Sequence, residues 1–188
     1  MKYYILLFVA FTSHAAFAAQ KYDLSKQETS VEFLAVGKPS MLKINGTGAK
    51  LSGQIEVSGN QISGDCTVAL NQLTTGIDLR DKHMKEKYLE TAKYPEATFT
   101  ISKIDLPLDF VNQKKSFSAV PFEGKMKVKN VEKEVRGLAD VDTSTANLIK
   151  VSTEFKSQIS SFQMDIPTYL GVKVADEVTV KTTMQLKK

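Results

Sequence analysis

Hydrophobic and polar residues alternate with a period of two along most of the chain. The clearest run is residues 178–186, where Val178, Val180 and Met184 alternate with polar or charged neighbours. This alternation is typical of strands with one buried and one solvent-facing side. Eight segments show the pattern: residues 31–36, 53–58, 62–70, 97–106, 122–128, 134–141, 149–159 and 178–186. The sequence therefore predicts an all-β fold.

Short connections separate these segments. Asn45-Gly46 is a strong turn signal, Gly59-Asn60 has two-residue hairpin spacing, and residues 130–133 form another tight link. Hairpins join antiparallel neighbours, so we expect an eight-stranded antiparallel β-barrel or a sandwich, and we favour the barrel because closure removes exposed sheet edges. A shift in the alternation near Lys103 predicts a β-bulge.

Residues 81–93 break the strand pattern and predict a short helix. Their apolar residues fall near one helical face: Met84, Tyr88, Leu89 and Ala92. Asp78 or Asp81 is available to cap the start, and Pro95 prevents continuation. We expect this helix to pack over one end of the barrel.

The first eighteen residues are typical of a secretory signal peptide. Lys2 precedes an apolar run at residues 3–11, and Ala16-Phe17-Ala18 fits the cleavage rule for small residues. The run is shorter than the about 20 residues that span a bilayer. We predict a signal peptide at residues 1–18, one domain at residues 19–188, and an exported protein that is periplasmic in a Gram-negative bacterium.

The composition offers little for catalysis. The 188 residues include one cysteine and two histidines, and the formal net charge is +4. One cysteine excludes an intrachain disulfide and a cysteine-based zinc cluster, and a small lysine excess outside any arginine-rich arm does not indicate nucleic-acid binding. No G-x-S-x-G motif is present, and ligands for a metal site are too few. We predict no enzyme, no metal and no cofactor.

The densest polar cluster lies at the predicted helix start. It consists of Asp78, Arg80, Asp81 and His83. Carboxylates at a helix start, with an arginine nearby, can form a structural brace. Alternatively, Arg80 or His83 contacts the head group of a ligand at the mouth of a cavity, and the two roles can coexist.

Residues 73–100 read LTTGIDLRDKHMKEKYLETAKYPEATFT. Thr75-Gly76-Ile77-Asp78, Arg80-Asp81-Lys82-His83 and Lys93-Tyr94-Pro95 in this segment resemble the signature region of the YceI family of secreted lipid- or polyisoprenoid-binding proteins. Further matches include Phe122-Glu123-Gly124 and the closing Val174-Ala175-Asp176-Glu177-Val178. The chain departs from the family pattern at residues 35–43, where many members carry a histidine and aromatic residues.

The resemblance implies a barrel similar to lipocalins, with an apolar tunnel for an isoprenoid or another long amphiphile and no enzymatic activity. The inner-facing residues that we expect to line the tunnel are Phe33, Cys66, Val68, Phe99, Ile101, Phe122, Met126, Phe155 and Met184. Burying about fifteen carbons yields on the order of 12 kcal/mol, against an association cost of roughly 4–15 kcal/mol. A long chain can therefore bind through tail burial alone.

The leading hypothesis is non-enzymatic binding, storage or transport of an isoprenoid or other long-chain lipid. Two alternatives stay open: a filled barrel that binds a protein partner through loops such as residues 37–43, and an enzyme that uses His83 as acid–base. A lysine-rich face at residues 125–136 is either a solvated surface or a contact for an anionic membrane. A second copy of the chain is a further candidate partner.

Overall fold

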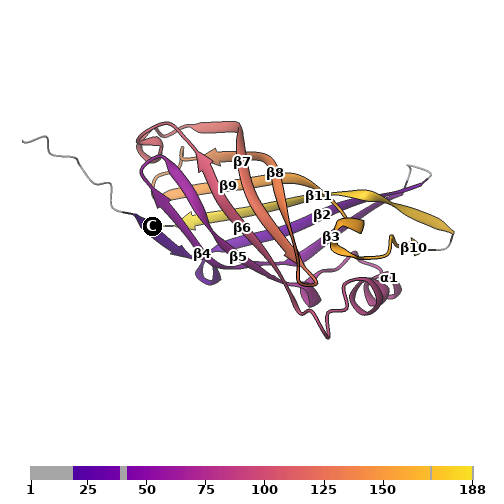
Figure 1. Ribbon diagram of the computed structural model, residues 1–188. Helices are drawn as coiled ribbons and strands as arrows, with labels where there is room; N and C mark the ends of the chain where they lie inside the picture. The colour runs from indigo at the N-terminus through magenta and orange to yellow at the C-terminus, as the bar shows by residue number, and fades with distance from the viewer. Residues whose placement is uncertain (1–18, 39–41, 170, 188) are drawn as a thin grey trace, which may run out of the picture.

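The computed structural model describes residues 19–38, 42–169 and 171–187. All eight alternating segments form strands of one antiparallel sheet, which confirms the predicted all-β class (Figure 1). These strands are β2 (Glu28–Lys38), β4 (Leu51–Ser58), β5 (Gln61–Ala69), β6 (Glu96–Asp105), β7 (Ser116–Val128), β8 (Val131–Asp142), β9 (Leu148–Gln158) and β11 (Val172–Lys187). The predicted signal peptide, residues 1–18, lies outside the described residues.

The prediction of an eight-stranded closed barrel is wrong. Three further strands are present, β1 (Gln20–Asp23), β3 (Lys43–Ala49) and β10 (Thr168–Tyr169). Within the described residues, ten strands form one open path in the order β1-β4-β5-β6-β7-β8-β9-β11-β2-β3, and β10 pairs with β11 beside that path. The fold is therefore a curled sheet, a half-barrel.

The additional strands explain why the backbone ladder does not close. Closure would pair β2 with β4, but β2 already lies between β11 and β3, and β4 lies between β5 and β1. A strand has only two hydrogen-bonding edges, so β2 and β4 cannot pair where β3 covers Val31–Val36 and β1 covers Gln54–Val57. A side chain spans the gap instead: the Thr29 hydroxyl accepts a hydrogen bond from the Leu51 amide at 2.9 Å and donates to the Leu51 carbonyl at 3.1 Å.

The predicted turn at Asn45-Gly46 is also wrong, because both residues lie within β3. Gly46 is opposite Phe33 on β2. A Cβ atom at Gly46 would lie 1.8 Å from Cε1 of Phe33. The glycine is required here because the phenylalanine ring occupies the space of a side chain.

Other local predictions hold. Gly59-Asn60 forms the two-residue turn between β4 and β5. The next tight link, between β7 and β8, uses Lys129 and Asn130, whose φ angles are +49° and +64°, as a primed hairpin turn requires. It therefore begins one residue before the predicted link. The register shift between Ile101 and Lys103 confirms the predicted bulge.

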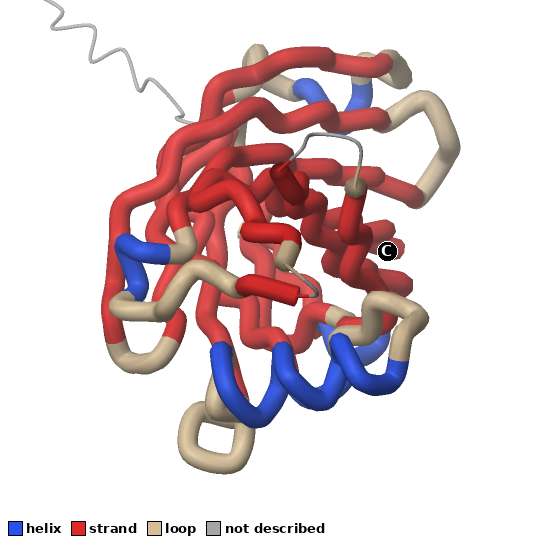
Figure 2. Tube along the Cα trace, turned by 90° about the vertical axis from the view of Figure 1, so that its right-hand side faces the viewer, coloured by secondary structure: helices blue, strands red, loops and turns tan. Residues whose placement is uncertain are grey.

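The helix begins and ends earlier than predicted. It consists of α1 (Asp78–His83) and a π-helical turn, η3 (Met84–Tyr88), in place of residues 81–93. Figure 1 shows α1 at the same end of the sheet as β10, and Figure 2 looks onto this end. Among the described residues, no helix has both the length and the apolar character needed to cross a bilayer.

The end of the sheet remote from α1 is filled by side chains. Those with at most 2% of their surface exposed include Ile62, Ile101, Ile104, Phe122, Val141, Ile149, Val151, Met184 and Leu186. They come from β5, β6, β7, β8, β9 and β11, and the strand registers place them beside one another. Side chains therefore fill the interior at this end, and the same hydrophobic core continues toward α1 through residues such as Val68, Leu73 and Phe99.

Candidate functional site

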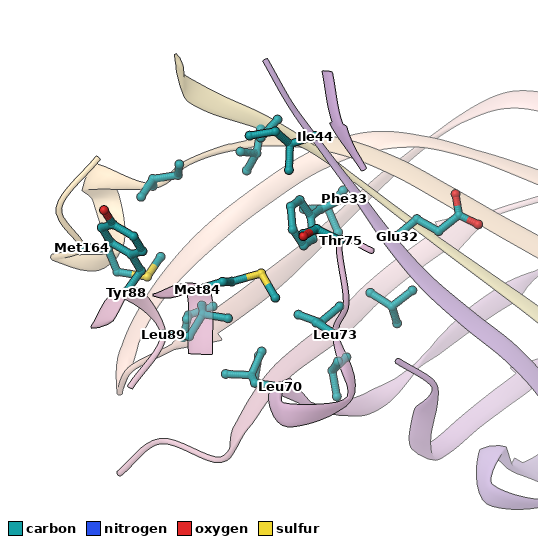
Figure 3. Close-up of a pocket in the computed structure, with 18 of the residues that line it drawn as sticks. Glu32, Phe33, Ile44, Leu70, Leu73, Thr75, Met84, Tyr88, Leu89 and Met164 are labelled. Carbon is teal, nitrogen blue, oxygen red and sulfur yellow. The ribbon is translucent and has the colours of Figure 1, made fainter. Parts of the chain in front are cut away.

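The curled sheet encloses a cavity at the end next to α1 (Figure 3). The centre of a water molecule could move through about 230 Å³ of it. Eight strands contribute apolar side chains to its wall: Val31, Phe33, Ala35, Ile44, Leu51, Val68, Ala97, Phe99, Met126, Val128, Phe155, Val174, Val178 and Val180. The carboxylate of Glu32 points away from these side chains (Figure 3). Such a wall suits a hydrocarbon chain and offers little to a polar ligand.

Two chain segments form the mouth of the cavity. One is the helix, which contributes Met84 and Tyr88, and the other is the segment at residues 159–168, which contributes Met164. Figure 3 shows Met84, Tyr88 and Met164 on the same side of the cavity. The backbone amide of Thr168 donates a hydrogen bond to the Tyr88 hydroxyl at 3.3 Å and so joins the two segments. Methionine side chains adapt easily to different apolar surfaces, which suits them to this position.

Three aromatic rings form the floor of the cavity. Phe99 and Phe155 are stacked, with 5.1 Å between their centroids and 17° between their planes. Phe122 lies edge-on to both, at 6.0 Å from each. Phe99 and Phe155 line the cavity, and Phe122 is buried beside them. On the side of β6, β7 and β9 the cavity therefore ends at a packed aromatic layer, and on the side of β2, β4 and β11 its wall continues to Val31, Leu51 and Thr182.

Asp81 holds the entrance loop against the helix. Its carboxylate accepts hydrogen bonds from the hydroxyls of Thr74 and Thr75 and, at 2.7 Å, from the Thr75 amide. Burial works to raise the pKa of Asp81, but these hydrogen bonds outweigh it and lower that pKa below its ordinary value. The backbone of Thr74 pairs in turn with Thr47 of β3. Asp81 therefore has the structural role of a brace.

Of the other three residues of the predicted entrance cluster, two line the cavity and one is exposed to solvent. Arg80 lines the cavity and donates to Thr75, from Nε to the hydroxyl and from Nη2 to the carbonyl, both at 2.8 Å. His83 also lines the cavity mouth. Asp78 is exposed in the first turn of α1. The structure thus brings Arg80 and His83 to the mouth.

Comparison with known proteins identifies the family. The sequence profile of the YceI-like domain matches residues 22–186. The chain belongs to the YceI-like family. A search of the curated proteins found no match.

Solved structures share the YceI-like fold at low sequence identity. A polyisoprenoid binding domain from Saccharophagus degradans, implicated in plant cell wall breakdown, is 17% identical, with a TM-score of 0.64 over 91% of this chain and 98% of that one. BcnA from Burkholderia cenocepacia is 20% identical, with a TM-score of 0.67 over 88% and 99%. The YCEI protein of Campylobacter jejuni is 17% identical, with a TM-score of 0.55 over 100% and 99%.

The residues predicted to line a tunnel separate into two groups in this YceI-like chain. Those on the cavity wall are Phe33, Val68, Phe99, Met126 and Phe155. Those buried beyond the wall are Cys66, Ile101, Phe122 and Met184. All nine belong to strands, but the second group lies at or below the level of the aromatic floor, where side chains fill the interior. The resemblance implied an elongated apolar tunnel; the structure has a cavity at the end of the sheet next to α1.

Several wall residues come from segments where sequence alternation gave no signal. Ile44 belongs to β3, whose Asn45-Gly46 sequence is typical of a turn. Leu73 precedes the helix, and Met164 lies between β9 and β10. Outside the predicted strands, the sequence signal for wall residues was the apolar face of the predicted helix. Leu89 on that face lines the cavity.

The reactive groups near the site are few. Burial, with a smaller effect of Asp65, raises the pKa of the Cys66 thiol to about 12, so the thiol stays protonated at neutral pH. Within the part of the chain that the structure describes, no group of three or more histidine, cysteine or acidic residues is placed to hold a metal ion. The arrangement is suited to binding an apolar chain with a polar end at the mouth.

Proposed function

We propose that this YceI-like protein binds one isoprenoid or other long-chain lipid, without catalysis, in the bacterial periplasm. The observation that carries the proposal is the apolar cavity, which is walled by side chains of eight strands and has Arg80 and His83 at its mouth. The similar Saccharophagus degradans structure is described as a polyisoprenoid binding domain, which supports the same class of ligand.

The geometry favours entry of the tail first. The apolar end would reach the aromatic floor, and the polar end would stay near Arg80 at the mouth. Thr75 engages two of the five N–H donors of the Arg80 guanidinium, so an anionic or hydroxyl head group would meet an oriented cation. Burying ten carbons contributes about 8 kcal/mol to binding, and association costs roughly 4–15 kcal/mol. A chain that only fills the cavity therefore binds more tightly when its head group also contacts Arg80.

The filled barrel that binds a protein partner fits less well. That alternative requires an interior without space for a lipid, and the structure has a cavity. Part of the loop assigned to the contact, residues 39–41, lies outside the described residues. The lipid-binding proposal uses the observed cavity and the filled barrel does not.

Exchange of the lipid with a membrane would use the cavity rim. On the lysine-rich face, pairing with carboxylates reduces the free positive charge: Lys125 with Glu132, Lys129 with Glu90, and Arg136 with Glu123. The rim instead exposes apolar side chains at the helix start, Ile77 at 45% and Leu79 at 52%. The exposed Lys82 lies beside them in α1. Apolar and cationic groups at the mouth favour a transient contact with an anionic membrane surface.

Native mass spectrometry tests the proposal. The protein purified from its own host, or loaded with long-chain isoprenoid alcohols and fatty acids, should carry one lipid per chain, and organic extraction should release it. A Val68→Trp variant, which fills the cavity from the wall of β5, should lose the lipid and remain folded by circular dichroism. A protein that neither retains nor takes up any long-chain amphiphile would refute the proposal.

A further inference from the structure

We infer that the aromatic floor made by Phe99, Phe122 and Phe155 limits the length of the apolar chain that the cavity accepts. This inference rests on the proposed function and adds a specificity to it. A chain would gain affinity with each methylene until its end meets the rings, and longer chains would leave the surplus at the mouth.

The rings form one continuous layer. Phe155 stacks on Phe99, and the edge of Phe122 is directed at both, so each ring contacts the other two. At most 4% of each residue is exposed. An arriving hydrocarbon chain would therefore have to separate three mutually packed rings to go deeper.

A glycine in the strand between them lets the rings meet. Phe122 lies on β7 and Phe155 on β9, and Gly137 of β8 is opposite both. A Cβ atom at Gly137 would lie 2.7 Å from Cε1 of Phe122 and 2.8 Å from Cβ of Phe155. Any larger residue would clash with both phenylalanines and with the Glu154 carbonyl oxygen, which lies 2.2 Å from the same position. The floor is thus built by four neighbouring strands, β6 to β9.

Beside the rings the cavity wall continues one register step beyond Phe155, to the paired residues Thr182 of β11 and Val31 of β2. On four strands the next inward-facing residue is buried and lies off the cavity wall: Cys66 on β5, Ile101 on β6, Thr153 on β9 and Met184 on β11. The hydroxyls of Thr153 and Thr182 share a hydrogen bond of 2.7 Å beside the floor, which satisfies both buried groups. Directly below the rings, on β5, β6 and β9, the interior is therefore occupied by the protein's own side chains.

The test measures affinity across a homologous series of saturated fatty acids and a parallel series of linear isoprenoid alcohols. For the unmodified protein, affinity should rise about fourfold per methylene and then stop rising at a limiting length. Phe155→Ala should move the limit to longer chains, so that a chain two methylenes beyond the original limit binds about fifteenfold more tightly. Val180→Phe, beside Phe155 in register, should move the limit to shorter chains.

Phe117→Ala is the matched control. It removes the same atoms from a buried ring that packs on Phe110, away from the cavity, and should leave the limit unchanged. Thermal unfolding establishes which variants are folded, and Val180→Phe decides alone if Phe155→Ala is not. Chains that bind with the same limit in every folded variant would overturn the floor and leave lipid binding intact. Failure of every chain to bind would overturn both proposals.

Discussion

Asp81 is a buried carboxylate surrounded by donors, and Asp81→Asn measures what the entrance brace contributes. Asp81 is 8% exposed and accepts three hydrogen bonds from Thr74 and Thr75. A hydrogen bond to a charged group exceeds a neutral one by about 1 kcal/mol, so three bonds predict a loss of about 3 kcal/mol of unfolding free energy. For a domain of this size that loss corresponds to about 6–12 °C in melting temperature.

The effect should depend on pH with a defined sign. The pKa of Asp81 is lower in the folded protein than its ordinary value of 3.8. The carboxylate therefore contributes its full stabilisation above the ordinary value and loses it as the pH falls through the lower, folded pKa. The difference in melting temperature between the two proteins should be largest near neutral pH and should shrink in acid.

Scanning calorimetry across this pH range is the assay, and Asp78→Asn is its control. Asp78 begins the same helix but is exposed, so its replacement should cost less than about 1 kcal/mol through the helix dipole. Equal losses for the two variants at neutral pH, or a difference that does not change with pH, would refute the assignment of Asp81 as the brace.

Three further predictions concern the cavity and its support. Tyr88→Phe removes the hydroxyl that accepts the Thr168 amide, a bond worth about 1 kcal/mol, and should speed release of a fluorescent fatty acid about fivefold in stopped flow. An unchanged release rate would show that this bond does not hold the mouth. The Cys66 thiol, whose pKa is raised to about 12, should resist iodoacetamide in the native protein and react after denaturation, whereas rapid native labelling would contradict its burial. Gly46→Ala should destabilise the protein by roughly 1–3 kcal/mol because of the ring of Phe33, and a second substitution, Phe33→Leu, should recover part of that loss in chemical denaturation. Additive effects of the two substitutions would refute the clash.

The strands were predictable because a half-buried strand leaves a direct record in its sequence. The alternation in residues 178–186 gives the two faces of β11, and Gly59-Asn60 gives the turn between β4 and β5. Asn45-Gly46 misled the prediction because its turn-forming residues serve a different purpose. Gly46 makes room for a ring on the neighbouring strand, and a local sequence does not contain its neighbour.

The YceI-like signature in residues 73–100 indicated the family from sequence alone, and the alternating pattern indicated eight of the strands and the two faces of each. Whether the sheet closes, and where its interior is hollow, were decided by the tertiary structure. Cys66 and Val68 share one face of β5, yet Cys66 is core and Val68 is cavity wall. The difference arises because aromatic rings from three other strands fill the interior beside Cys66 but not beside Val68. Alternation along one strand gives the direction of a side chain, but it does not show which space the neighbouring strands leave empty.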